Sequence, residues 1–142
     1  MLLVSGYGFG RLAERRHYRS IIERESRYST LPAIASRYPP LEPPYGQALV
    51  TGSTVVSVDY FKRFLAALRS LFGGRVSAYE SLLDRARRES LLRMKERAAA
   101  LGASMVLNVK YETVSISKGA GNTIGSIEVL AYGTALIPPR AE

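Results

Sequence analysis

The residues best placed for chemistry lie where two glycines give way to a long, charged helix. Arg75 follows Gly73-Gly74, and Tyr79 comes one helical turn later. The N–H groups of a helix N-terminus and a guanidinium together favour an anion. Arg75 and Tyr79 are therefore candidates for a small anionic site or a subunit contact. The simpler alternative is an ion pair between Arg75 and Glu80 or a neighbour's carboxylate.

Two carboxylates follow on the same helix. Glu80 and Asp84 are four residues apart, so they face the same way and could hold a cation with hard oxygen ligands. Arg87 and Arg88 come one turn later and would pair with them. A salt-bridged helix face is thus the simpler interpretation of Glu80 and Asp84.

Other catalytic and metal chemistry finds little support in the composition. The chain has no cysteine and one histidine, His17, which lies among arginines and is more typical of a surface residue. No G-x-S-x-G is present, and the glycines at 6, 8 and 10 and in KGAGNTIG lack the context of a phosphate-binding loop. We expect no enzyme. A metal ion stays an open alternative that the Cys and His content does not support.

The helix that carries these residues is marked at both ends. Ser77 and Glu80 form an S-x-x-E capping box, and Gly102 supplies the residue that ends a helix. The predicted core stripe consists of Tyr79, Leu82, Leu83, Ala86, Ser90, Met94 and Leu101. Leu91 and Leu92 point to either side of the stripe, which makes them candidates for a subunit interface. A wide core stripe is the alternative.

The segments around this helix predict an α+β fold. Residues 47–57 and 126–137 are predicted strands, and Gly52 indicates a bulge or a close backbone approach. Residues 59–72 predict a helix. Residues 103–117 predict a half-exposed strand, with 106, 108, 110, 112 and 114 on one side.

The resulting order is β-α-α-β-β. Its last two strands form a hairpin around the glycine-rich loop 118–125. A three-stranded antiparallel-type sheet with helices on one face leaves its other face and both edges open, and a closed ring of protomers would cover them.

The N-terminal third is different in kind. Residues 11–29 predict an exposed, charge-laced helix, and residues 30–46 hold five of the seven prolines and predict an extended linker. We therefore divide the chain into a basic arm with linker, 1–46, and a domain, 47–142. The apolar run 1–10 before an arginine cluster is typical of an anchor remnant, and a packed or frayed arm is the alternative.

Size and charge limit the partners. The 142 residues suit one ordinary domain, and the net charge of +8 is spread over both parts of the chain. Nucleic acid is accordingly not the partner we expect. No apolar run of 18 residues occurs, and the start does not have the form of a signal peptide. We expect a cytoplasmic location, with membrane association through the arm as an alternative.

Several motifs together resemble one family. They are VTGSTVV, the GGR-x-x-x-YE junction, AAALGASMVLNV, YETVS and AYGTAL. They are similar to the YbjQ family, also called the "putative heavy-metal-binding domain", over roughly residues 47–140. The resemblance implies a dodecin-type subunit that assembles as a homopentameric ring. The implied function is a ring-forming binding or structural module that holds a metal ion or small ligand between subunits. The alternative is a membrane- or partner-tethered scaffold without a ligand.

Overall fold

The computed structural model describes residues 2–39, 45–57, 75–117 and 124–139, and the chain divides into two compact units, 1–30 and 31–142. Each unit is described by itself. The predicted helix at 59–72 lies outside the described residues, as does most of the glycine-rich loop at 118–125.

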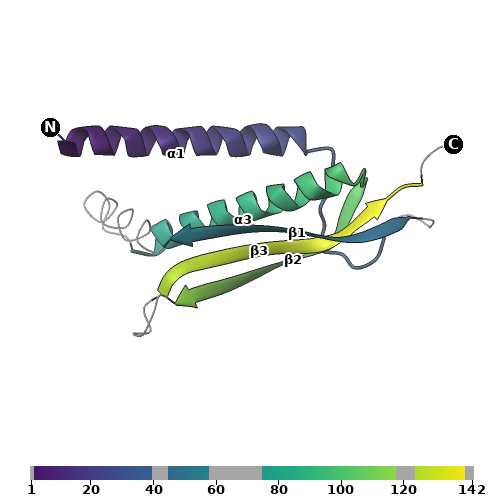
Figure 1. The fold of residues 1–142 in the computed structure, drawn as a ribbon. Coiled ribbons are helices and arrows are strands. Elements are labelled where there is room, and N and C mark those ends of the chain that lie inside the picture. The colour runs from purple at the N-terminus through teal and green to yellow at the C-terminus, as the bar shows by residue number, and fades with distance from the viewer. Residues whose placement is uncertain (1, 40–44, 58–74, 118–123, 140–142) are drawn as a thin grey trace. The chain divides into compact units, whose positions relative to one another are not determined.

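The first unit is a single helix, α1, which runs from Leu2 to Arg27 (Figure 1). The helix predicted at 11–29 is confirmed, but it begins nine residues earlier because the apolar run 1–10 is also helical. A turn follows, in which the Ser29 N–H donates to the Ser26 carbonyl at 3.3 Å. Within the described part of the chain, no helix is apolar over a length that would cross a bilayer.

The second unit is a three-stranded antiparallel sheet with a helix, α3, against it (Figure 1). The strands are β1 (Gly46–Ser57), β2 (Met105–Ser117) and β3 (Ile124–Ile137), in the order β1-β3-β2. All three predicted strands are confirmed, and β2 and β3 pair antiparallel as predicted. The α+β fold class is therefore correct, and β1 and β2 are the two edges of the sheet.

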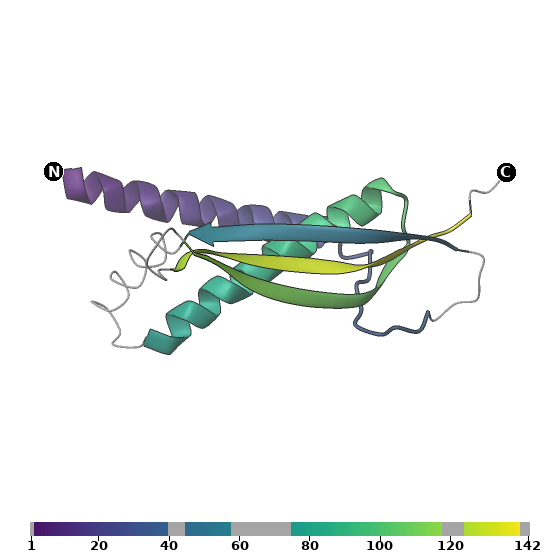
Figure 2. The same cartoon turned by 60° about the horizontal axis from the view of Figure 1, so that its bottom comes forward.

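Helix α3 spans Arg75–Ala100 and crosses the sheet diagonally (Figure 2). It begins two residues before Ser77, so the predicted capping box at Ser77 and Glu80 is wrong. Arginine is a good helix former, and Arg75 extends the helix N-terminally past the serine.

The predicted end of α3 is confirmed. Gly102 has φ +73°, which side chains with a Cβ rarely adopt. The N–H of Gly102 donates to the Ala99 carbonyl at 2.9 Å, and that of Ala103 to the Ala98 carbonyl at 3.0 Å. These two bonds form a Schellman motif, which satisfies two terminal carbonyls of the helix.

On the face of α3 that meets the sheet, every fourth residue is buried. Its buried members are Leu82, Ala86, Ser90, Met94 and Ala98. Leu101 is 47% exposed and does not belong to the predicted stripe, because the helix has already ended. Leu91 is half-buried and packs against the core cluster, so the prediction that it points away from the core is wrong. Leu92 is buried but lies outside that cluster.

Gly52 marks the point where α3 comes nearest to β1. A Cβ at this position would collide with the Ser90 carbonyl oxygen and the Met94 nitrogen, and would lie 2.9 Å from the Arg93 Cβ. The predicted close backbone approach at Gly52 is therefore confirmed. The small side chains of Ser90 and Ala98 allow the same proximity from the helix side.

Strand β2 contains a bulge that the sequence did not predict. The register with β3 shifts between Leu107 and Lys110, and Asn108 has φ +52°. Asparagine is one of the few residues that tolerate this conformation. Val106 and Tyr111 consequently lie on the same face, opposite Ala135 and Ala131, so the predicted simple alternation along residues 106–114 is wrong.

The first residues of the proline-rich segment form part of this unit. Leu31 belongs to the core cluster, and Ala33 makes a parallel bridge with Val106. The Val106 N–H donates to the Pro32 carbonyl at 2.9 Å, and the Ile34 N–H to the Val106 carbonyl at 3.0 Å. The backbone is extended here, as predicted, but it pairs with β2 and does not only connect two parts of the chain.

Candidate functional site

The four predicted ligand or contact residues, Arg75, Tyr79, Glu80 and Asp84, lie within the first ten residues of α3, and the interface candidates Leu91 and Leu92 lie in its second half. Arg75 and Tyr79 belong to its first two turns, and their side chains lie outside the described residues. Arg75 is a helical residue and not a loop residue, which corrects its expected position. Glu80 and Asp84 are exposed and one turn apart. The predicted shared face of these two carboxylates is therefore compatible with the helix.

Asp84 lies near a residue that the sequence did not single out. Tyr111 of β2 is 40% exposed, and burial raises the pKa of its phenol. The Arg87 charge acts in the opposite direction on this pKa, and the Asp84 charge raises it further. Helix α3 thus brings Asp84 and Arg87 near Tyr111 on the edge strand β2. No sequence spacing relates residue 84 to residue 111, so only the fold reveals this proximity.

The described residues do not form a metal centre in one chain. Among them, no group of three or more His, Cys, Asp or Glu side chains could hold an ion. The whole sequence has no cysteine and one histidine, so a soft heavy metal finds neither thiolates nor a pair of imidazoles. The donor set does not fit a heavy-metal site within a single protomer.

Two arginines of α3 reach the edge of the sheet at β1. Arg97 Nη1 donates to the Thr51 carbonyl at 2.9 Å and to Thr51 Oγ1 at 2.7 Å. Arg93 Nη1 donates to the Ser53 carbonyl at 2.8 Å, and its Nε contacts Glu89 Oε1 at 2.9 Å. Glu89 is only 4% exposed and orients Arg93. Sequence analysis missed this network because at least 40 residues of chain separate the two arginines from their acceptors.

A buried hydroxyl links the helix to the middle strand. Ser90 Oγ lies 2.8 Å from the Ala86 carbonyl and 2.8 Å from the Val129 carbonyl of β3. Ser90 is fully buried. The placement of Ser90 in the core stripe is therefore correct, and its hydroxyl is satisfied by backbone acceptors.

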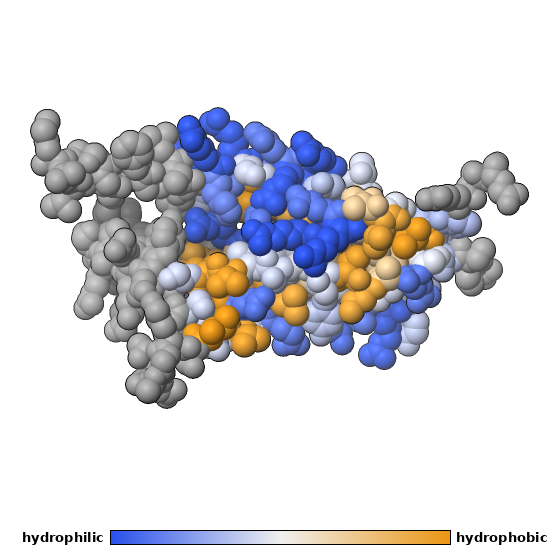
Figure 3. All heavy atoms as spheres, in the orientation of Figure 1, coloured by the Kyte–Doolittle hydropathy of each residue, from blue (hydrophilic) through white to orange (hydrophobic). Residues whose placement is uncertain are grey.

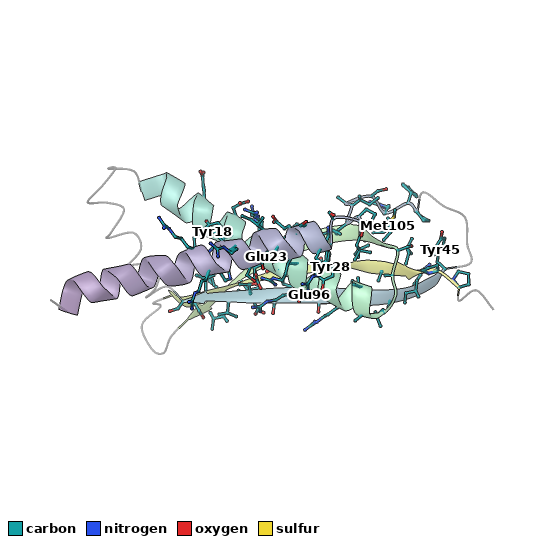
Figure 4. All side chains as sticks on the ribbon, turned by 90° about the horizontal axis from the view of Figure 1, so that it is seen from above. Tyr18, Glu23, Tyr28, Tyr45, Glu96 and Met105 are labelled. Carbon is teal, nitrogen blue, oxygen red and sulfur yellow. The ribbon has the colours of Figure 1, made fainter. Side chains whose placement is uncertain are left out.

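The sheet face turned away from α3 carries exposed apolar side chains. Val50 and Gly52 of β1 point to the helix, so the residues of opposite parity point away from it. The exposed apolar members of this outer face are Leu49 (73%), Val55 (58%), Val114 (54%) and Ile116 (44%). Figure 3 shows an orange patch where β2 ends and β3 begins. In Figure 4, Met105 and Tyr45 mark the opposite end of the sheet, where β2 and β1 both start.

Residues 46–138 match the model of a protein family described as "Putative heavy-metal-binding", the YbjQ family. This match covers β1, α3, β2 and β3. The chain belongs to the YbjQ family.

Curated relatives of this YbjQ domain carry the name UPF0145 protein. One from Hahella chejuensis is 42% identical over 89 residues, which are 63% of this chain and 80% of the relative. One from Thermus thermophilus is 44% identical over 62% of this chain and 72% of the relative. One from Saccharolobus solfataricus is 40% identical over 67% of this chain and 78% of the relative.

A solved structure was also found, a protein of unknown function of the DUF74 family from Pediococcus pentosaceus. It superposes with a TM-score of 0.43 at 14% identity, over 75% of this chain and 96% of that one.

Proposed function

We propose that this YbjQ protein is a non-enzymatic, self-assembling binding or structural module that forms a closed ring, with five copies as the expected number. In this proposal the dodecin-like subunits cover each other's open sheet surfaces. The clefts between subunits hold a small ligand or a metal ion. The protein acts in the cytoplasm.

The exposed apolar outer face of the sheet is the observation that supports assembly. An antiparallel sheet with one free face normally turns polar side chains to water. Here Leu49 and Val55 of β1 are more than half exposed, as is Val114 of β2. Exposed apolar patches of this kind mark interaction surfaces. A second copy of the chain carries the same exposed apolar side chains, and contact between the two copies would bury the outer face of each.

The ligand in this proposal lies between subunits, because the residues that the structure describes in one chain do not form a metal site. Glu80 and Asp84 are exposed carboxylates on α3, and several copies together could contribute enough oxygen ligands for a hard cation. Arg75 and Tyr79 would add an anion-binding group or a subunit contact. The heavy-metal label of the family finds no thiolate in this chain to support it.

Native mass spectrometry of the full chain tests this proposal directly. The protein is purified without chelators, and metals are quantified on the same sample. We expect a homo-oligomer, and a pentamer with stoichiometric metal would place the ligands between subunits. A metal-free pentamer would support the structural module and direct the search to small molecules. A monomer at micromolar concentration would refute the assembly.

A tethered scaffold is the second candidate, and one observation favours it. Helix α1 is continuous from Leu2 to Arg27, so its apolar first third and its arginines belong to one rigid element. Such a helix could dock at an anionic membrane surface or on a partner. Flotation with anionic vesicles, compared between the full chain and a variant that lacks residues 2–10, measures this association. Equal flotation of both proteins would contradict the tether.

A further inference from the structure

The two edges of the sheet differ in what already occupies them. On β1, Arg97 and Arg93 donate to the carbonyls of Thr51 and Ser53 at 2.9 and 2.8 Å. These carbonyls are the acceptors that an added strand would need. The middle of the β1 edge is thus closed by side chains of the same protomer.

The first half of the β2 edge already pairs with an extended segment of the same chain. Besides the two bonds at Val106, the Asn108 N–H donates to the Ser36 carbonyl at 2.8 Å, and the Val109 N–H to the Ile34 carbonyl at 3.0 Å. The chain has therefore already added an extended segment to this edge. Among the described residues, the backbone pairing at the β2 edge ends at Val109.

The register of the strands shows which backbone N–H and C=O groups in the second half of β2 point away from β3. Since the carbonyls of Thr51 and Ser53 point to the outer edge of β1, neighbouring residues in β1 bond inward to β3. This alternation, carried across β3, directs Lys110 and Glu112 toward their partners Tyr132 and Leu130. The N–H and C=O groups of the residues between and after them then point to the open edge; these residues are Tyr111, Thr113 and Ser115.

We infer that the β2 edge at residues 111–115 accepts an extended strand from a second copy of this chain, while Arg93 and Arg97 keep the middle of β1 out of such pairing. This inference rests on the proposed self-assembly and specifies the sheet edge at which two copies pair.

Three features of this edge fit a second copy. Residues 110–117 read KYETVSIS, with one Lys and one Glu, so the segment is neutral although the chain carries +8. A like-charged copy is therefore not repelled at this edge. The segment has no proline or glycine and is rich in residues that favour strands. Val114 and Ile116 within this segment are exposed, and a paired strand would cover part of their apolar surface.

A pair of proline substitutions tests the inference in the full chain. Thr113→Pro removes an N–H that faces the open edge and leaves the bonds to β3 in place. Ser53→Pro removes the equivalent outward N–H from the closed edge and is the matched control. Native mass spectrometry and sedimentation velocity compare both variants with wild type, and circular dichroism shows that both are folded.

We expect Thr113→Pro to weaken assembly at least tenfold in subunit concentration and Ser53→Pro to leave it unchanged. A Thr113→Pro protein that assembles like wild type would overturn the inference and leave the proposed assembly standing. A monomeric wild type would instead refute the assembly itself. If Thr113→Pro does not fold, a photo-crosslinking residue at Thr113 replaces it. A crosslink to another copy supports the inference, and an assembled protein without one overturns it.

Discussion

The two edges of this sheet solve the same problem by different means. The β1 edge is satisfied by two guanidinium groups from the helix above it. The β2 edge is satisfied up to Val109 by backbone from the chain's own segment 32–36, and beyond Val109 it has no backbone partner among the described residues. Side chains close an edge without extending it, but an added segment shows that the edge can be extended. A small sheet can therefore block strand addition at one edge and accept it at the other.

The largest expected change in stability follows from disrupting the close contact between α3 and β1 at Gly52, because this contact brings Arg93 and Arg97 to the β1 edge. Gly52→Ala places a methyl group against the backbone of α3 at Ser90 and Met94. The helix must lift from β1, and Arg93 and Arg97 lose their reach to the edge. We expect a loss of about 3 kcal/mol in the free energy of unfolding, measured by urea denaturation.

The control for that variant is Gly102→Ala. No heavy atom lies within 4 Å of a Cβ at Gly102, so its cost is the left-handed backbone alone, about 1 kcal/mol. A Gly52→Ala protein no less stable than Gly102→Ala would mean that the helix does not approach β1 as closely as described.

The second-largest effect is expected from removing the two arginines that close the β1 edge. The double variant Arg93→Ala/Arg97→Ala frees the carbonyls of Thr51 and Ser53, so both edges can accept strands. We expect species larger than the wild-type assembly, seen by sedimentation velocity, and a loss of about 2 kcal/mol in unfolding free energy from the lost charged hydrogen bonds.

The double variant Arg15→Ala/Arg16→Ala removes the same charge from exposed positions of α1 and serves as its control. If both double variants showed the same distribution of species, net charge and not edge closure would determine association.

The smallest effect concerns Tyr111 at the open edge. Burial raises the pKa of this phenol above 10.0, the ordinary value. Because the folded-state pKa is the higher one, the stabilisation is complete below pH 10 and is lost as the pH rises through the folded-state pKa. Stability of the wild type should therefore fall more steeply above pH 10 than that of Tyr111→Phe, as measured by denaturation at several pH values.

The same residue also reports on pairing at the β2 edge. A second copy at this edge would bury Tyr111 further, so the Tyr111 phenol should titrate higher in the wild-type assembly than in Thr113→Pro. Ultraviolet titration of the two proteins, each compared with its Tyr111→Phe version, measures this difference. Identical Tyr111 titration in the two proteins would argue against a copy at this edge.

Local signals in the sequence predicted much of this fold. The strands followed from β-branched residues, the helix end from Gly102, and the close approach from Gly52 inside a strand. Each depends on residues near one another in the chain. The start of α3 was missed because Ser77 matched a capping pattern that the longer helix does not use.

The features at the two edges could not be predicted in the same way. Arg93 meets Ser53 across 40 residues, and Ile34 meets Val109 across 75. These contacts exist only once α3 lies across the sheet and the proline-rich segment returns along β2. The candidate residues Glu80 and Asp84 were found from their spacing, but their proximity to Tyr111 depends on tertiary structure and not on any motif.

The bulge at Asn108 has a further consequence for how β2 can change over time. One extra residue reverses the parity of the strand, so that Val106 and Tyr111 both face the helix although they are an odd number of positions apart. Because two residues of β2 lie opposite the single residue Gly133 of β3, a single-residue deletion here would remove the bulge and restore regular pairing, and Tyr111, Val114 and Ile116 would keep their present faces. The chain between Leu107 and Lys110 can therefore lose one residue without exchanging the two faces of β2, whereas a deletion after Lys110, where the pairing is regular, would exchange them for the positions that follow.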